Sequence, residues 1–115
     1  MGKFLNKVTG TKGEILATEY LKKQKYKIIE TNYTTKLGEI DIIAKDDDTL
    51  VFVEVKTRST KAFGLPREAV TPYKQHKIRL LATQYLKANK LLQEKCRFDV
   101  IEILDTEITH LKNCF

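Results

Sequence analysis

The middle of the chain contains two stretches in which apolar residues alternate with polar or charged ones. These are residues 38–44 and residues 52–58, and their period of two is typical of strands whose two faces differ. Residues 46–49, Asp-Asp-Asp-Thr, lie between them and are compatible with a turn. The pattern therefore predicts an antiparallel hairpin closed by a four-residue loop.

The midpoint of that loop sets the register of the hairpin. If the loop is centred between its second and third residues, Asp41 lies opposite Glu54. Glu39 then lies opposite Lys56. Directly opposed side chains have β-carbons about 4.5–5.5 Å apart, so three carboxylates and one ammonium group gather in one patch. Because opposed carboxylates repel each other, a divalent cation with oxygen ligands would stabilise the pair.

The alternative is that these charged residues are simply solvated on the open face of the hairpin. Glu54 shares its face of the strand with Leu50 and Phe52, because the three residues alternate along it. Other elements are then expected to cover part of that face. We therefore favour a binding site over a solvated surface.

A first helix is predicted over residues 13–24, with Thr11 as its N-cap and Glu14 completing a capping box. Glu14 lies on the same stripe of the helix as the residues expected to face the core. It has two interpretations: it caps the helix, or it projects toward the acidic patch on the sheet. The core-facing residues are Ala17, Tyr20 and Leu21.

Periodicity and turn residues also define the remaining elements. Further strands are predicted over residues 26–33, 97–103 and, more briefly, 106–111. A second helix begins at Thr71 and Pro72, an N-cap and first-turn pair, and reaches about Asn89. Its apolar stripe consists of Ile78, Leu81, Ala82, Tyr85 and Leu86. The order of elements predicts an α/β fold with an αβββαβ core, in which helices flank a mixed sheet and the second helix crosses over to a parallel strand.

The length of 115 residues fits one domain with a single core, residues 1–115, in which residues 1–10 form a loosely held terminus. No apolar run approaches the ~20 residues of a membrane span, and the start lacks a signal-peptide core. We therefore expect no membrane association and a cytoplasmic location. Cys96 and Cys114 are expected to be thiols rather than a disulfide. His76 and His110 lack ligand spacing and are expected to be structural or surface residues.

The net charge of +6 is unevenly distributed along the chain. Residues 37–56 contain six acidic residues and two lysines, a balance of −4, so the rest of the chain carries +10. A basic body around an acidic centre favours a metal-using enzyme with a polyanionic substrate, although lysine-rich surfaces are also common in small proteins. Contacts with nucleic acid are expected from four residues at and beyond the end of the hairpin, one of them in the loop of residues 59–66. These are Arg58, Lys61, Lys74 and Gln75.

The acidic patch has the residue types that phosphodiester hydrolysis requires. One or two Mg²⁺ ions on Asp41 and Glu54 would polarise the phosphate, and the Val55 carbonyl could add an oxygen ligand. Lys56 shares a face with Glu54 and would hold the attacking hydroxide or neutralise developing charge. Two further carboxylates would widen the site or anchor a metal-bound water: Glu14 and Glu39. No glycine-rich phosphate loop is present, which argues against a nucleoside-triphosphate enzyme.

Asp41 followed by Glu54-Val55-Lys56 at the end of the next apolar strand resembles the PD-(D/E)xK nuclease motif. The wider pattern consists of Gly13, Glu14, Ala17, Tyr20, Leu21, Asn32, residues 38–41, residues 52–58 and residues 97–100. It is similar to the YraN family, bacterial proteins regarded as predicted endonucleases related to archaeal Holliday junction resolvases. The resemblance spans roughly residues 10–115.

This resemblance implies a restriction-endonuclease-like fold and a DNA endonuclease that uses Mg²⁺ or Mn²⁺ and acts on branched or repair intermediates. It carries metal binding onto Asp41 and Glu54, catalysis onto Lys56, and a supporting role onto Glu14 and Glu39. A non-cleaving nucleic-acid-binding module with the same fold is the alternative. A junction resolvase needs two symmetry-related sites, which leaves a homodimer open.

Overall fold

The computed structural model describes residues 12–58 and 70–115. The described elements are helix α2 (Lys12–Lys23), strands β1 (Lys27–Thr35), β2 (Gly38–Asp46) and β3 (Thr49–Arg58), helix α3 (Pro72–Ala88), and strands β4 (Lys95–Leu104) and β5 (Glu107–Leu111). Each corresponds to an element predicted from the sequence. Three predictions fall outside the described residues: the terminus at residues 1–10, the N-cap Thr11, and the loop of residues 59–66 with Lys61.

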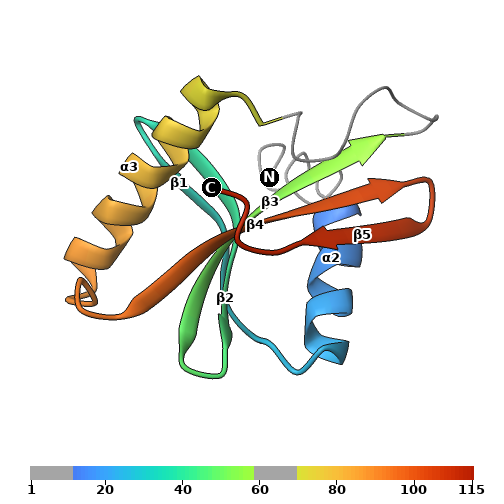
Figure 1. The fold of residues 1–115 in the computed structure, drawn as a ribbon, viewed down its shortest axis with the longest axis horizontal. Helices are drawn as coiled ribbons and strands as arrows, with labels where there is room; N and C mark the ends of the chain where they lie inside the picture. Colours follow the sequence, from blue (N-terminus) through green and yellow to red (C-terminus); the bar gives the residue numbers. More distant parts are fainter. Residues whose placement is uncertain (1–11, 59–69) are drawn as a thin grey trace, which may run out of the picture.

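The five strands form one mixed sheet in the order β1-β2-β3-β4-β5. Antiparallel pairing joins β1, β2 and β3, whereas β4 runs parallel to β3 after the crossover that contains α3. β5 closes the sheet as an antiparallel neighbour of β4. The two helices lie on opposite sides of the sheet (Figure 1). The α/β prediction is confirmed, and the arrangement is consistent with a restriction-endonuclease-like fold.

The sheet divides the core into two layers, one beneath each described helix. The layer beneath α3 includes Phe52 and the whole predicted stripe of that helix. The layer beneath α2 includes Val51 and Val53. The physical reason is that the central strand β3 is covered on both faces, so consecutive residues are buried on alternate sides.

The start of α3 is fixed by the capping pair that the sequence predicted. Thr71 has extended backbone angles (φ −66°, ψ 160°), and its hydroxyl accepts a hydrogen bond from the Lys74 amide at 3.2 Å. Pro72 occupies the first turn, where its missing N–H is not needed. This cap brings the first turn of α3, and Lys74 with it, to a defined position over the sheet.

The β2–β3 hairpin has the predicted register but a shorter loop. The ladder runs from Asp46↔Thr49 to Ile42↔Val53, so the turn contains two residues rather than the predicted four. Asp47 at this turn has φ 58°, a left-handed conformation that aspartate tolerates.

The predicted pairing of Asp41 with Glu54, and of Glu39 with Lys56, is not part of the ladder, which ends at Ile42↔Val53. Alternation also breaks along β2 at this point. Ile40 and Ile43 both pack in the layer under α3, although residues three apart on a regular strand face opposite sides. Asp41 lies at this break in alternation, and its Oδ2 accepts a hydrogen bond from the Val55 amide.

Candidate metal centre

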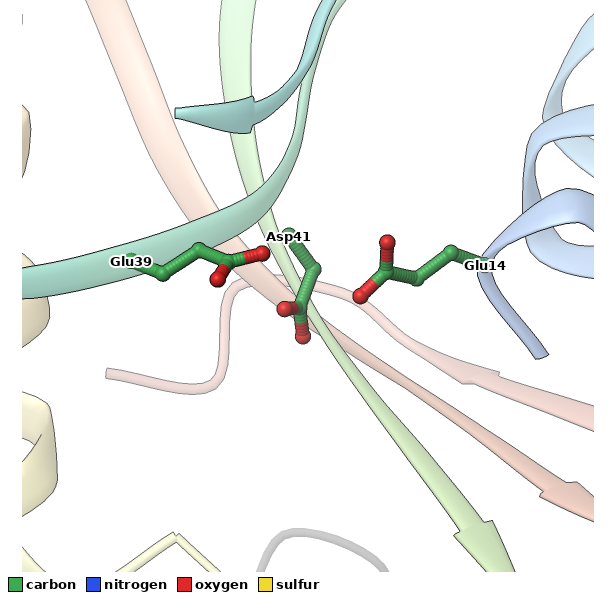
Figure 2. Close-up of side chains that lie close together, drawn as sticks. All are labelled: Glu14, Glu39 and Asp41. Atoms are coloured by element: carbon green, nitrogen blue, oxygen red, sulfur yellow. The ribbon is translucent and has the colours of Figure 1, made fainter. Parts of the chain in front are cut away.

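Three carboxylates from α2 and β2 converge where the alternation of β2 breaks. Glu14 projects from the first turn of α2, and Glu39 and Asp41 come from β2. One carboxylate oxygen from each lies within 4.8 Å of the other two. Figure 2 shows the Asp41 carboxylate between those of Glu39 and Glu14. Of the two interpretations of Glu14, projection toward the acidic patch is therefore the one observed.

The position of Glu14 depends on close packing of α2 against β3. Gly13 is buried, and a β-carbon at this position would collide with the Thr57 hydroxyl. Glycine therefore lets the first turn of α2 approach the end of β3 closely. Burial raises the pKa of Glu14, and the neighbouring charges of Glu39 and Glu54 raise it further, although a hydrogen bond from Asn32 acts in the opposite direction.

Asn32 links the two outer carboxylates of this centre. Its side-chain amide donates to Glu14 Oε1 at 2.6 Å and to Glu39 Oε2 at 2.5 Å. Its backbone is left-handed, with φ 55°, in the interior of β1, where an extended conformation is the rule. Sequence reasoning gave Asn32 no role of its own. The signal was an asparagine inside a strand, a residue that is depleted there and tolerates positive φ.

Asp41 carries the strongest electrostatic perturbation of the centre. Its Oδ2 accepts a hydrogen bond from the Val55 amide at 2.8 Å. Burial and the nearby charge of Glu54 raise its pKa from 3.8 to about 8, against the lowering effect of that amide. The described contact of Val55 is thus made through its N–H to Asp41, whereas the sequence analysis had invoked its carbonyl.

Glu54 is only 6 % exposed and is held by two lysines. Its Oε2 lies 2.8 Å from Lys74 Nζ and 3.5 Å from Lys56 Nζ. Burial and the adjacent Lys74 lower the pKa of Lys56, against the attraction of Glu54. Burial acts to lower the pKa of Lys74 as well, but its hydrogen bonds to Glu54 and Lys56 outweigh this and raise it. Lys74 was predicted as a nucleic-acid contact, and the structure places it against Glu54 at the edge of the site.

Two other predicted nucleic-acid contacts, Arg58 and Gln75, have local partners. Arg58 Nε lies 2.8 Å from Glu102 Oε2. Gln75 donates from its side chain to the carbonyl of Val70, which precedes the N-cap of α3, at 2.9 Å and so stabilises the helix start. Neither residue is brought into the carboxylate cluster.

A second acidic network lies elsewhere on the sheet, around Asp99. This residue is 0 % exposed, and its carboxylate accepts bonds from Arg97 at 3.0 Å, His110 at 2.7 Å and the Asn113 amide at 2.9 Å. His110 also meets the Tyr20 hydroxyl at 3.2 Å. The prediction that His110 is structural is supported by this position. Burial alone would raise the pKa of Asp99, but these hydrogen bonds lower it.

The donor set of the first centre suits a hard divalent cation. Its three clustered ligand atoms are carboxylate oxygens, the ligands that Mg²⁺ and Mn²⁺ prefer. The raised pKa of Asp41 indicates more negative charge than the site can hold ionised without a counter-charge. A dication would supply that charge. Glu54 lies outside the three-residue cluster but close enough to influence Asp41.

The fold and site together define an α/β protein with a mixed five-stranded sheet and a carboxylate centre between α2 and β2. The chain belongs to the uncharacterised protein family UPF0102, whose model matches residues 13–103. A UPF0102 protein of Alkaliphilus oremlandii is 51 % identical over 96 % of this chain and 100 % of its own length. One from Geotalea daltonii is 49 % identical over 99 % of this chain and 94 % of its own length.

These matches confirm the family that the sequence resemblance indicated. The further placement among PD-(D/E)xK nucleases stays a prediction. Neither of the two described helices is both long and apolar enough to cross a membrane.

Proposed function

We propose that this protein is a metal-dependent endonuclease that hydrolyses phosphodiester bonds in DNA, including branched or repair intermediates. The observation that carries the proposal is the convergence of Glu14, Glu39 and Asp41 beside a lysine-bound glutamate. A purely structural cluster would be expected to pair its acids with cations. Here Asp41 has a pKa raised to about 8, so the cluster favours a bound positive charge that the protein does not itself supply.

In this proposal the three clustered carboxylates hold Mg²⁺ or Mn²⁺, and Asn32 keeps the outer two in position. Glu54 completes the acidic side of the site from β3, as the resemblance to the nuclease motif implies. A bound cation would polarise the phosphate oxygens and offset charge that develops on them. The basic remainder of the chain, with +10 outside residues 37–56, would attract the polyanionic substrate.

The two lysines around Glu54 are assigned different tasks. Lys56 has a lowered pKa, and its ammonium group would hold the attacking water or stabilise the charged transition state. Lys74 forms the shorter ion pair and would orient the Glu54 carboxylate. Because 41 % of its side chain is exposed, Lys74 can also reach a phosphate that enters the site.

The proposal is tested by incubating the protein with plasmid, branched and single-stranded DNA in the presence of Mg²⁺, Mn²⁺ or EDTA. We expect cleavage with either cation and none with EDTA. Lys56→Ala and Asp41→Asn should lower the rate by at least ~100-fold, as the loss of a group that stabilises the transition state does. Lys95→Ala is the matched control, because Lys95 is exposed and pairs only with the surface residue Asp48 among its described contacts.

Absence of cleavage on every substrate, or cleavage that Lys56→Ala leaves unchanged, would contradict an enzymatic role. Salt-sensitive binding that survives both substitutions would then favour the non-cleaving nucleic-acid-binding module.

A further inference from the structure

A cavity of about 280 Å³ lies between α2 and β1, directly beside the carboxylate centre. Its wall is made of one face of α2 and two residues of β1: Glu14, Ile15, Thr18, Glu19, Lys22, Thr31 and Asn32. Glu14 and Asn32 belong to both the cavity and the carboxylate centre. A group in this cavity would therefore sit next to any phosphodiester bound at the centre.

The lining of the cavity indicates the chemistry of its occupant. Glu14 and Glu19 contribute carboxylates, which accept hydrogen bonds from N–H groups, and Lys22 contributes an ammonium group, which donates to carbonyl or ring-nitrogen acceptors. Thr18 and Thr31 add hydroxyl groups that both donate and accept. Ile15 is 48 % exposed and offers an apolar surface on which a flat group can pack. The cavity thus suits a neutral, partly apolar group that carries both N–H donors and hydrogen-bond acceptors.

The volume of the cavity limits the size of the group that can occupy it. It lies just under the ~300 Å³ lower limit of cavities that bind drug-sized ligands, so it fits a smaller fragment such as a single base. A basic side chain of a protein partner would also meet the carboxylates. The chain carries a net charge of +6, however, which disfavours a basic partner and favours a nucleic acid.

On the assumption that the proposed function holds, we infer that this cavity receives an unpaired nucleobase with an exocyclic amino group from the strand that is cut. Cytosine, adenine and guanine carry such a group, and carboxylates recognise it on cytosine as acceptors. Thymine lacks it. A base inside a duplex has its pairing edge occupied and must leave the stack before it can enter a pocket. The protein would therefore prefer single-stranded or branched regions and cut at a fixed distance from an amino-bearing base.

The inference is tested with a labelled branched DNA whose single-stranded arm is all thymidine except for one cytidine, dC, moved stepwise along the arm. Cleavage with Mn²⁺ is mapped for each position. We expect the main cut to move with dC and its rate to exceed that of the all-thymidine arm by roughly fivefold or more. Replacing dC by N4,N4-dimethylcytidine, which has no N–H donor at that position, should remove the preference.

Two variants change the cavity without touching the carboxylate cluster. Thr18→Leu partly fills the cavity, and Glu19→Gln replaces a carboxylate by an amide. Both should cut the all-thymidine arm at the wild-type rate and lose the dependence on dC. Thr83→Leu makes the same change as Thr18→Leu on the exposed surface of α3, and this control variant should keep the dependence on dC.

Cuts that ignore the position of dC, or a preference that survives both variants, would overturn the inference while leaving the proposed function intact. If no substrate is cut, the proposed function fails. The cavity is then judged by fluorescence anisotropy of the same arms with Ca²⁺. If the protein binds the dC arm more tightly than the all-thymidine arm, and Thr18→Leu abolishes that difference, the inference is supported. Equal binding of the two arms overturns the inference.

Discussion

Asp41 and Asp99 are two aspartates on one sheet with opposite surroundings. Asp99 is fully buried and accepts hydrogen bonds from an arginine, a histidine and a backbone amide, which lower its pKa. Asp41 is partly buried, accepts one bond from the Val55 amide, and faces other carboxylates, so its pKa rises to about 8. The charge of Asp99 is neutralised by the protein itself. The charge of Asp41 is not, which is why we place the functional centre there.

This difference distinguishes a carboxylate that stabilises the fold from one that we propose to be functional. The Asp99 network connects β4, β5 and the residues after β5, since its partners lie in all three. Loss of that network should therefore cost stability. The Asp41 centre gathers like charges that repel, and a protein retains such an arrangement at the expense of stability when function requires it.

The largest expected effect on stability comes from substitution of Asp99. Asp99→Asn leaves Arg97 and His110 without their shared anion and should lower the free energy of unfolding by about 3 kcal/mol at pH 7. Urea denaturation followed by circular dichroism measures this. A loss below ~0.5 kcal/mol would show that the network is not a structural anchor.

The same substitution at Asp41 should act in the opposite direction. The folded-state pKa of about 8 lies above the ordinary 3.8, so the stability linked to that proton is complete below pH ~4 and is lost as the pH rises toward 8. Asp41→Asn removes this loss and should stabilise the metal-free protein by on the order of 2 kcal/mol at pH 9, and by much less at pH 5.

Urea denaturation at the two pH values, with EDTA present, checks the sign. Glu107→Gln, which removes an exposed carboxylate from the β4–β5 hairpin, is the matched control and should change little. Destabilisation by Asp41→Asn at pH 9 would mean that Asp41 is a structural residue after all.

Gly13→Ala tests how the helix brings its acid to the centre. The added methyl group meets the Thr57 hydroxyl and should cost roughly 1–3 kcal/mol, because α2 must move outward and carry Glu14 with it. Adding Thr57→Ala removes the colliding hydroxyl and should restore most of the stability and the Mn²⁺ affinity. A double variant no better than Gly13→Ala would contradict the packing argument.

The smallest expected change in stability, about 1 kcal/mol, concerns Asn32. Asn32→Gly keeps a residue suited to φ 55° but removes the amide that joins Glu14 to Glu39. We expect Mn²⁺ affinity, measured by electron paramagnetic resonance, to fall by about tenfold. Asn113→Gly makes the same change at another left-handed asparagine, φ 56°, and should leave the affinity unchanged.

The sequence predicted most of the fold because the relevant signals are local. Period-two alternation located β2 and β3, turn residues set the correct hairpin register, and Thr71 with Pro72 marked the start of α3. The loop length was wrong because the ladder extends to Asp46↔Thr49. The centre of the turn did not change, so the register was unaffected.

The site was predicted less completely because its geometry depends on tertiary contacts. Strict alternation placed Asp41 opposite Glu54, but alternation breaks between Ile40 and Ile43, and the Asp41 carboxylate clusters with those of Glu14 and Glu39. The bridge through Asn32 depends on a left-handed backbone that alternation does not reveal. The Lys74–Glu54 pair depends on how α3 packs on the sheet. The apolar stripe of the helix indicated which face packs, but not where Lys74 would lie.

Binding of Mn²⁺ at the carboxylate centre tests the central claim most directly. Titration at pH 8, followed by the electron paramagnetic resonance signal of free Mn²⁺, should reveal a saturable site in the wild-type protein. Asp41→Asn should remove that site or weaken it at least tenfold, whereas Glu107→Gln should keep it. Equal Mn²⁺ binding by the wild-type protein and Asp41→Asn would contradict the assignment of this cluster as a metal centre.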